Sequence, residues 1–368
     1  MAVMKTTLTI RSSTFIFYRA LQFILILSIL YLIPSLPSFA QQNVPINIHG
    51  KIVNKETGLP MEYVNVFLAN TTIGTTTGKD GEFKIHSAPI GAYDIVFSCV
   101  GFEMQKKHIE ISERQTINFN ISLAMKTLFY NQIDIIEKIA DDWKDNLRIF
   151  TKMFLGESDN AGETKILNPE VLSFKEDKKS NLLKAYTDSV LKIENRSLGY
   201  MMKVVLDSLI YNKANKSIKY TVYSRFHELT PTSKEDSIEW DKRRHKTYLN
   251  SPRYFFYQLI NKKLYRNEFK LYTGTIYDLL NREGTPIEWQ DLNISTDNDS
   301  TVYDFKFSGC LKVKRGSQIS ILSFYKWYTE LNKYGNFLKP FYTVEIYGYW
   351  GVQGMADALP LNYVFTEK

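Results

Sequence analysis

Hydrophobic and polar residues alternate with a period of two over much of residues 46–123, which predicts short β-strands with one buried face. The apolar positions that share a face are Val64, Val66 and Leu68; Phe83 and Ile85; Ile95 and Phe97; and Ile117, Phe119 and Ile121. One apolar face on each strand predicts two sheets packed face to face. About ten such side chains, each contributing roughly 1.5–3 kcal/mol when buried, suffice for an independent domain over residues 44–123.

Glycine and proline separate these strand-like segments. Thr57-Gly58-Leu59-Pro60 interrupts the chain before residue 61, and Pro89-Ile90-Gly91 interrupts it before residue 93. Between them, Asp80-Gly81 precedes the strand Glu82–Ile85. An Asp-Gly pair supplies the positive φ that a tight hairpin turn needs. These turns predict a small antiparallel β-sandwich.

Six short segments follow one another in the order and spacing of a known domain. They are Gly50–Val53, Thr57–Pro60, Val64–Val66, Gly74–Thr77, Asp80–Phe83 and Cys99–Phe102. The stretch resembles the carboxypeptidase-like regulatory domain, a transthyretin-like or Ig-like all-β sandwich of secreted and envelope proteins in Bacteroidetes-type bacteria. The resemblance covers nearly all of residues 46–123. It implies a fold and an exported location, but no carboxypeptidase activity, because catalysis in that family belongs to a separate domain.

After a predicted linker at residues 124–135, the pattern becomes helical. Apolar residues recur at spacings of three and four, at Ile136, Ile139, Trp143, Leu147, Phe150 and Phe154, and Gly156 supplies a stop. Period-two alternation then returns in residues 200–206 and 218–226, which predicts a long hairpin. Residues 136–368 are therefore expected to form an α+β domain rich in antiparallel strands.

Two further helices are predicted from their start signals. Ser233 precedes acidic residues, and Ser251 precedes Pro252, so each serine is expected to cap a helix. Beyond them, residues 302–313, 319–324 and 341–350 have the composition of strands, with a turn at residues 315–317. The run from Trp240 to Phe256 loosely resembles regions that follow this sandwich in other Bacteroidetes proteins, a likeness that implies no activity.

Residues 1–40 have the three parts of a secretory signal peptide. Lys5, Arg11 and Arg19 form a basic region, residues 21–33 form an apolar core, and Ser38-Phe39-Ala40 is a small-residue cleavage site. We expect export to the periplasm or outer membrane of a Gram-negative bacterium, with no membrane span after signal removal. An uncleaved N-terminal anchor is the alternative, because apolar residues extend from residue 15 to residue 33.

The net charge bears on possible partners, and the cysteine content bears on disulfide formation. Removing residues 1–40, which carry three basic residues and no acid, lowers the formal net charge from +7 to +4. A surplus this small and dispersed does not predict nucleic acid as a partner. Cys99 and Cys310 are far apart in the sequence and lie in strand-like segments, which favours two free thiols over a disulfide.

No set of residues has the spacing of a known catalytic or metal site. The five histidines are His49, His86, His108, His227 and His245, and none has a glutamate three positions later, as a zinc carboxypeptidase requires. We therefore expect no catalytic residue, no metal and no cofactor, and a protein that is not an enzyme. Its partner is expected to be an envelope protein or a glycan.

Three hypotheses on function remain open from the sequence. The first is a non-enzymatic envelope protein whose β-sandwich serves binding or assembly. The second is a carbohydrate-binding accessory protein, in which Tyr347, Tyr349 and Trp350 stack on sugar rings, although core packing explains these aromatics as well. The third is a hydrolase whose site in residues 136–368 is built from residues distant in sequence.

Overall fold

The computed structural model describes residues 46–89, 91–111, 116–126, 140–214, 217–264, 268–296, 302–325, 327–339 and 344–365. The predicted signal peptide at residues 1–40 lies outside these ranges, as do residues 127–135 of the predicted linker. The described residues belong to one compact unit, which spans Pro45–Lys368. They form five β-sheets, which we number I to V in chain order of their first strands.

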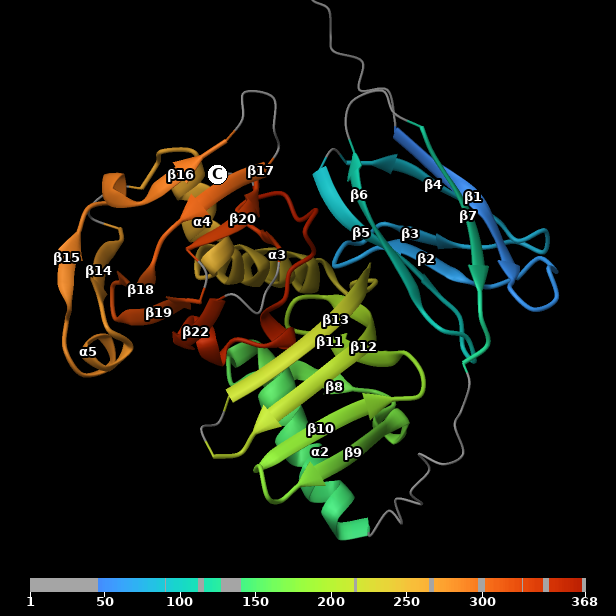
Figure 1. The fold of residues 1–368 in the computed structure, drawn as a ribbon, viewed down its shortest axis with the longest axis horizontal. Coiled ribbons are helices and arrows are strands. Elements are labelled where there is room, and N and C mark those ends of the chain that lie inside the picture. Colours follow the sequence, from blue (N-terminus) through green and yellow to red (C-terminus); the bar gives the residue numbers. More distant parts are fainter. Residues whose placement is uncertain are drawn as a thin grey trace, which may run out of the picture. The chain divides into compact units, whose positions relative to one another are not determined.

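Sheets I and II make the predicted sandwich (Figure 1). Their strands, in sheet order, are β4 (Glu82–Ala88), β1 (Ile46–Asn54) and β7 (Ile117–Leu123) in sheet I, and β3 (Gly74–Thr76), β2 (Asn65–Leu68), β5 (Gly91–Ser98) and β6 (Gln105–Ile111) in sheet II. The apolar positions predicted from the alternation lie in the core between them, with Val64, Val66 and Ile95 fully buried. The fold class predicted for this part of the chain is confirmed.

Two details of the sandwich differ from the prediction. Strands β1 and β7 pair in parallel, from Ile48 with Ile117 to Asn54 with Leu123, so the sandwich is not wholly antiparallel. The Asp80-Gly81 turn has the predicted positive φ, 74° at Gly81. It does not close a hairpin, however, because β3 and β4 belong to different sheets. Alternation gives the buried face of each strand, but it carries no information on which strand lies beside it.

Sheet III has six strands and carries α2 (Ala140–Leu155) on one face (Figure 1). Its central strand is β12, which pairs with β13 along one side and with β11 and then β10 along the other. The bounds are β8 (Thr164–Ile166), β9 (Leu172–Asp177), β10 (Leu182–Thr187), β11 (Leu191–Asn195), β12 (Tyr200–Asn212) and β13 (Ser217–Glu228). The predicted long hairpin is β12–β13, and α2 ends before Gly156, as predicted.

Sheets IV and V complete the strand-rich second region. Sheet IV contains β15 (Thr285–Ile287), β14 (Lys270–Gly274), β18 (Gly309–Arg315), β19 (Gln318–Phe324) and β22 (Val344–Gly348), and sheet V contains β16 (Asn293–Ser295), β17 (Val302–Lys306), β20 (Tyr328–Asn332) and β21 (Phe337–Lys339). The run 302–313, which resembles one strand in the sequence, is divided between the two sheets. The break precedes Gly309, whose φ is 96°.

Helices and short 3-10 turns connect these sheets. The helices are α3 (Lys234–Leu249), α4 (Pro252–Ile260) and α5 (Ile276–Asn281), and the 3-10 turns are η2 (Asp159–Glu163), η3 (Pro169–Val171), η4 (Trp289–Asp291), η6 (Trp350–Val352) and η7 (Met355–Asp357). The side chain of Ser233 caps α3 through the backbone N–H of Asp236, and Ser251 caps α4 with Pro252 in its first turn. Both predicted helix starts are confirmed.

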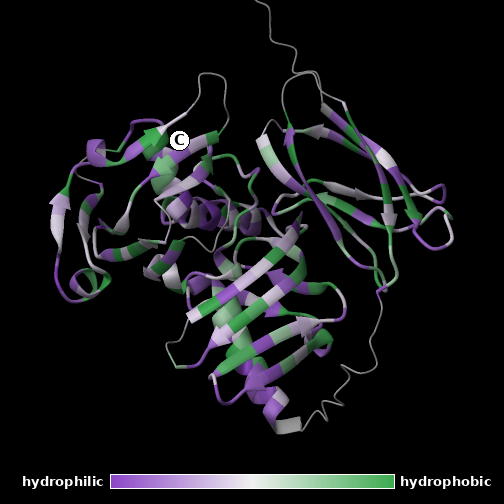
Figure 2. Ribbon diagram, in the orientation of Figure 1, coloured by the Kyte–Doolittle hydropathy of each residue, from purple (hydrophilic) through white to green (hydrophobic). Residues whose placement is uncertain are grey.

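The three largest of the five hydrophobic cores among the described residues each fill one part of the unit. One fills the sandwich, and a second lies between α2 and sheet III, where the Phe154 and Tyr220 rings meet with centroids 5.3 Å apart. The third packs α4 against sheets IV and V and is rich in aromatic residues, including Phe255, Phe256 and Phe305. Figure 2 shows the matching alternation of hydrophilic and hydrophobic residues along the strands of sheet III.

Residues 353–365 run across several of these parts. Gln353 forms an isolated β-bridge with Gly156, just after α2. The backbone N–H of Leu361 donates to the carbonyl oxygen of Asn70 in the sandwich, at 2.7 Å. Arg253 on α4 donates to the carbonyl oxygens of Pro360, Leu361 and Tyr363. This segment therefore binds α2, the sandwich and α4 at once.

Candidate ligand-binding surface

The pairing of β19 with β22 brings two tyrosines to one glutamate. Glu345 lies opposite Ser323, and Tyr347 lies opposite Ile321, so their side chains share one face of sheet IV. The Tyr347 hydroxyl donates to Glu345 Oε2 at 2.5 Å. The hydroxyl of Tyr325, which follows β19, also bonds to the Glu345 carboxylate. Glu345 is thus held between two phenol groups.

These hydrogen bonds set the ionisation of the three side chains. The bond to Glu345 is the main reason that the pKa of Tyr325 is raised to about 12. Burial, followed by the same carboxylate, raises the pKa of Tyr347. Burial acts to raise the pKa of Glu345, but the two hydroxyls and nearby Lys219 outweigh it and the net shift is downward. Glu345 is therefore a stable carboxylate, able to accept further hydrogen bonds.

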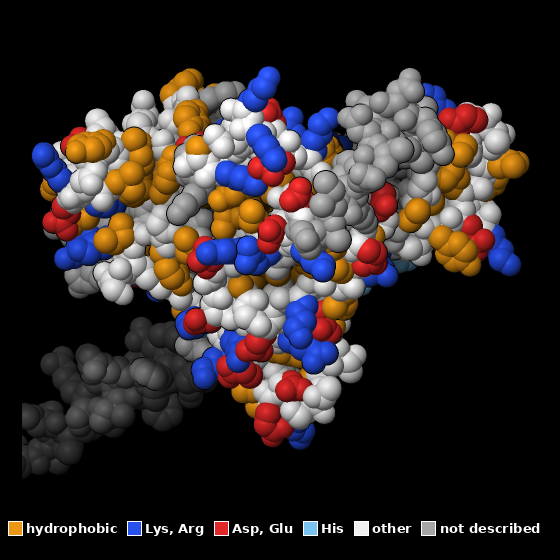
Figure 3. Space-filling view, turned by 90° about the horizontal axis from the view of Figure 1, so that it is seen from below, with side chains coloured by type: hydrophobic (Ala, Val, Ile, Leu, Met, Phe, Trp, Pro, Cys, Tyr) orange, Lys and Arg blue, Asp and Glu red, His pale blue; other side chains and the backbone are white. Residues whose placement is uncertain are grey.

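Three aromatic side chains at and after the end of β19 face solvent, and one of them, Tyr325, bonds to this carboxylate. Tyr325 is 60% exposed, Trp327 is 61% exposed and Tyr328 is 39% exposed. The Trp327 and Tyr328 rings meet edge to face with centroids 5.1 Å apart, and the Lys306 ammonium lies 5.7 Å from the Trp327 centroid. We call Tyr325, Trp327, Tyr328 and Tyr347 the aromatic cluster. On the face drawn in Figure 3, hydrophobic side chains form separate groups among charged ones.

The structure brings one of the three aromatics predicted from the sequence to this cluster. That residue is Tyr347. Tyr349 is half-buried against the core of sheets IV and V. Trp350 is only 8% exposed, and its ring packs 5.8 Å from that of Phe255. The Trp350 ring therefore has the environment of a core residue.

Sequence reasoning missed Tyr325, Trp327 and Tyr328. A signal was available, because three aromatics fall within four residues directly after a predicted strand. Strict alternation would bury some of that group and expose the rest. Their common exposure arises because β19 ends at Phe324 and β20 begins in another sheet at Tyr328.

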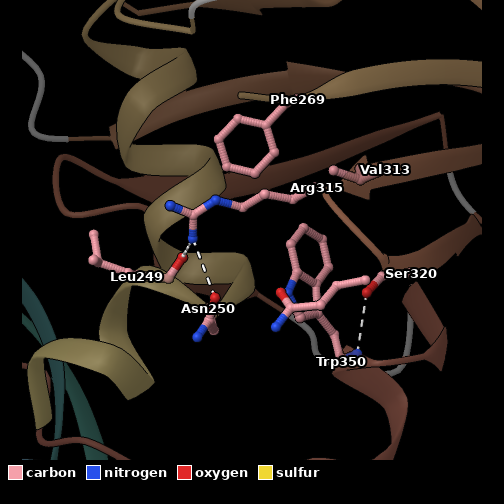
Figure 4. Close-up of a pocket in the computed structure, with 8 residues that line it drawn as sticks. Leu249, Asn250, Phe269, Val313, Arg315, Ser320 and Trp350 are labelled. Carbon is pink, nitrogen blue, oxygen red and sulfur yellow. Dashed lines mark hydrogen bonds between the residues drawn. The ribbon is translucent and has the colours of Figure 1, made fainter. Parts of the chain in front are cut away.

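A small pocket near Trp350 is filled by an arginine (Figure 4). Arg315 donates to the carbonyl oxygen of Leu249 and to Asn250 Oδ1, and its guanidinium lies 5.5 Å from the Phe269 ring centroid. The volume that remains is about 10 Å³, room for roughly one water molecule. The arrangement joins the end of α3 to sheet IV, and it leaves no space for a substrate.

A second polar group lies where η2, α3 and η7 meet. Asn160 Nδ2 donates to Asp357 Oδ1 at 2.8 Å and to Thr247 Oγ1 at 3.0 Å, and Asn160 Oδ1 accepts from Ser197 Oγ at 2.5 Å. Burial raises the pKa of Asp357, although its hydrogen bonds oppose the shift. Among the described residues no histidine bonds to this group, so neither serine nor threonine has the usual base beside it. We assign the group a structural role.

Other reactive groups are dispersed. Cys99 and Cys310 are both free thiols, as the sequence favours, and burial raises the pKa of Cys99. In the described part of the chain, no three histidine, cysteine or acidic residues gather as a metal site would require. A helix with the length and hydrophobicity to cross a bilayer is also missing from the described residues.

The comparison with family models identifies the sandwich. Residues 48–134 match the model of the CarboxypepD_reg-like domain, which confirms the resemblance seen in the sequence. The domain is a non-catalytic Ig-like module, and no catalytic family matches the chain. The comparison with curated proteins finds no match.

Solved structures are similar to this chain only distantly. A type II cohesin–X-dockerin complex from Acetivibrio cellulolyticus shows 17% identity and a TM-score of 0.19, over 21% of this chain and 56% of that one. This chain thus spans little more than half the length of that structure. A DUF3823 family protein from Bacteroides ovatus shows 9% identity and a TM-score of 0.18, over 78% and 98% of the two chains. A 9R-lipoxygenase from Cyanothece shows 10% identity and a TM-score of 0.19, over 61% and 49%. Likenesses this weak carry no information on function.

Proposed function

We propose that this protein is a non-enzymatic, exported binding protein of the bacterial cell envelope and that its ligand is a carbohydrate. The observation that carries the proposal is the aromatic cluster, in which the exposed Tyr325 ring bonds to a stable carboxylate and the exposed Trp327 ring follows two residues later. The signal-like pattern of residues 1–40 and the sandwich family support the envelope location. The non-catalytic sandwich serves as an accessory module, and the second region holds the ligand.

The chemistry of the cluster suits a sugar. The apolar face of a pyranose ring packs on the face of an aromatic side chain, and Tyr325 and Trp327 offer large exposed rings. The hydroxyl groups at the rim of the sugar need acceptors, and a carboxylate is the strongest that a protein side chain provides. Glu345 supplies it, because its two tyrosine bonds leave acceptor capacity on the oxygens.

Affinity electrophoresis with a panel of soluble neutral and acidic polysaccharides tests the proposal. We expect at least one polysaccharide to retard the wild-type protein. Trp327→Ala should weaken that binding about tenfold, which corresponds to about 1.4 kcal/mol. The matched control is Tyr277→Ala on α5, an aromatic that is 70% exposed and lies outside the cluster. Retardation by no polysaccharide, or equal losses in the two variants, would contradict the proposal.

A further inference from the structure

The face of sheet III that points away from α2 carries rows of basic side chains. Strand alternation puts the buried positions of β9 to β13 against α2 and places the intervening positions on the outer face. The basic residues on that outer face are Lys175, Lys184, Lys192, Lys203, Lys219 and Arg225, which we call the basic face. They come from five different strands, so only the sheet register brings them together.

The register sets like charges directly opposite each other. Lys192 pairs with Lys203, and Lys203 pairs in turn with Arg225 on the next strand. Lys175 pairs with Lys184 at the other end of the sheet. Directly opposed like charges destabilise a sheet, since their Cβ atoms are only about 4.5–5.5 Å apart. Three such pairs on one face indicate that the lysines serve to bind an anionic ligand, whose charge would offset the repulsion.

Acidic side chains of the protein neutralise this face only in part. In the described ranges, Lys175, Lys184, Lys192 and Lys203 have no ion pair. Glu194 lies on the same face but binds Arg196 at 2.9 Å. Asp177 accepts hydrogen bonds within its own turn, and the charge of Lys184 adds to these bonds in lowering its pKa. The positive charge of the basic face also affects a neighbouring side chain. Burial lowers the pKa of His227, and the charges of Arg225 and Lys203 lower it further.

The basic face is long and continues to the aromatic cluster. Its basic residues form two rows across the strands. Lys192, Lys203 and Arg225 form the first row, and Lys175, Lys184 and Lys219 form the second. The rows cross β12 at Lys203 and Ile210, which are seven residues apart, or roughly 23 Å along a strand. A ligand that reaches both rows must therefore be a chain with several negative charges. Lys219 at the end of the second row lies 3.9 Å from Glu345, the carboxylate within the aromatic cluster. One extended ligand can contact both surfaces.

We infer that the glycan bound by this protein is acidic, a polysaccharide with carboxylate groups that runs from the aromatic cluster across the basic face. This inference rests on the proposed carbohydrate-binding function and specifies its substrate class. The exposed ring of Tyr186, two residues from Lys184 on the same face of β10, provides a further stacking position for a sugar.

Nucleic acid and an anionic bilayer fit the same face less well. Each nucleic acid strand carries a charge every 3.4 Å or so in a duplex, whereas the β12 positions between the two basic rows include the uncharged Val205 and Ser208 and the exposed carboxylate of Asp207. A flat bilayer is disfavoured because the sandwich covers part of the basic face. Residues of the sandwich contact Tyr223 and Arg225 on this same face, so a planar surface cannot lie along it.

The test compares the full chain on alginate, a polyuronate, with a neutral mannan of similar length. We expect tighter binding to alginate, with an affinity that falls steeply as salt rises. Lys184→Gln/Lys203→Gln should weaken alginate binding at least fivefold and reduce the salt dependence, with little change on mannan. The control Lys144→Gln/Lys234→Gln removes the same charge from exposed positions on α2 and α3 and should bind as wild type does.

The thermal midpoint separates loss of binding from loss of fold. Lys184→Gln/Lys203→Gln should melt at or above the wild-type temperature, because the substitutions relieve the repulsion between opposed lysines. Equal affinity for alginate and mannan, or an equal loss in the control, overturns the inference and leaves the proposed function standing. Failure to bind either polysaccharide overturns both. Tighter binding to oligo(dT) or to phosphatidylglycerol vesicles than to alginate overturns the choice of partner.

Discussion

Asn70 and Ser224 are 154 residues apart in the chain and are joined by two hydrogen bonds. The backbone N–H of Asn70 donates to the Ser224 carbonyl oxygen at 2.7 Å, and the backbone N–H of Ser224 donates to Asn70 Oδ1 at 3.2 Å. Asn70 has a φ of 59°, a left-handed conformation that asparagine tolerates better than most residues. This asparagine fastens the sandwich to the edge of β13.

Substitution of Asn70 separates its two contributions. Asn70→Gly keeps the left-handed backbone accessible and removes the side-chain acceptor, so we expect a loss of about 1 kcal/mol in the free energy of unfolding. Asn70→Ala also strains the backbone, and we expect a further loss of roughly 1 kcal/mol. Urea denaturation of the full chain measures both. Equal losses would show that the left-handed conformation is not required.

Gly81→Val should destabilise the sandwich strongly. A side chain at Gly81 meets a positive φ of 74° and would also place its Cβ 2.4 Å from the Ile52 carbonyl oxygen. The matched control is Gly58→Val, because Gly58 has a φ of 71° but a Cβ added there would meet no described residue within 4 Å beyond its chain neighbours. We expect Gly58→Val to cost about 1–3 kcal/mol from strain alone and Gly81→Val to cost more. Indistinguishable thermal midpoints would rule out the close approach at Gly81.

Arg253→Lys should loosen the segment that follows η7. The guanidinium of Arg253 donates to three carbonyl oxygens, at distances of 2.9–3.1 Å, and a lysine ammonium cannot reach all three from one position. We expect a loss of roughly 2–3 kcal/mol in the free energy of unfolding and faster amide exchange around residues 360–363. Exposed Arg148→Lys on α2 should change stability by less than about 0.5 kcal/mol. Unchanged amide exchange around residues 360–363 in Arg253→Lys would show that the arginine does not hold this segment in place.

Asp357→Asn should change how stability depends on pH. Because burial raises the pKa of Asp357, the folded protein binds this proton more tightly than the unfolded chain does. The contribution of Asp357 to stability is therefore complete below its ordinary pKa of 3.8 and declines as pH rises through the raised value. The asparagine variant should lack this decline and should be at least as stable as wild type at pH 7.

Urea midpoints measured between pH 4 and pH 8 check this prediction. Asp159→Asn is the control, since it removes the same charge from a neighbouring carboxylate that is 97% exposed. If Asp357→Asn is less stable than wild type at every pH, Asp357 acts as a buried charge that Asn160 and its neighbours stabilise, contrary to our interpretation.

Local signals in the sequence predicted much of the secondary structure. The caps at Ser233 and Ser251, the stop at Gly156 and the positive φ of Gly81 each depend on a few adjacent residues, and all four are confirmed, whereas the hairpin predicted at Gly81 is not formed. Alternation likewise predicted which side chains fill the sandwich core. These features can be predicted from the sequence because their physical causes act over a single turn or strand.

Features that depend on register were not predictable in the same way. The parallel pairing of β1 with β7 joins segments about seventy residues apart, and nothing local requires it. Tyr347 is the one residue of the aromatic cluster that the sequence analysis predicted. Tyr325 was missed because its position beside Glu345 follows from the pairing of β19 with β22. The basic face is also a product of register, since its lysines are scattered in the sequence and become neighbours only across strands.

The segment at residues 353–365 has a consequence for the timing of folding. It binds α2, the sandwich and α4, all of which are synthesised before it. Domains generally fold as their residues leave the ribosome, so the sandwich can form early while its attachment to the later elements remains incomplete. Until residues 353–365 arrive, Arg253 and Asn70 lack partners that they have in the finished protein. The chain therefore passes through a stage in which its separate cores exist but the contacts that residues 353–365 supply between them are still missing.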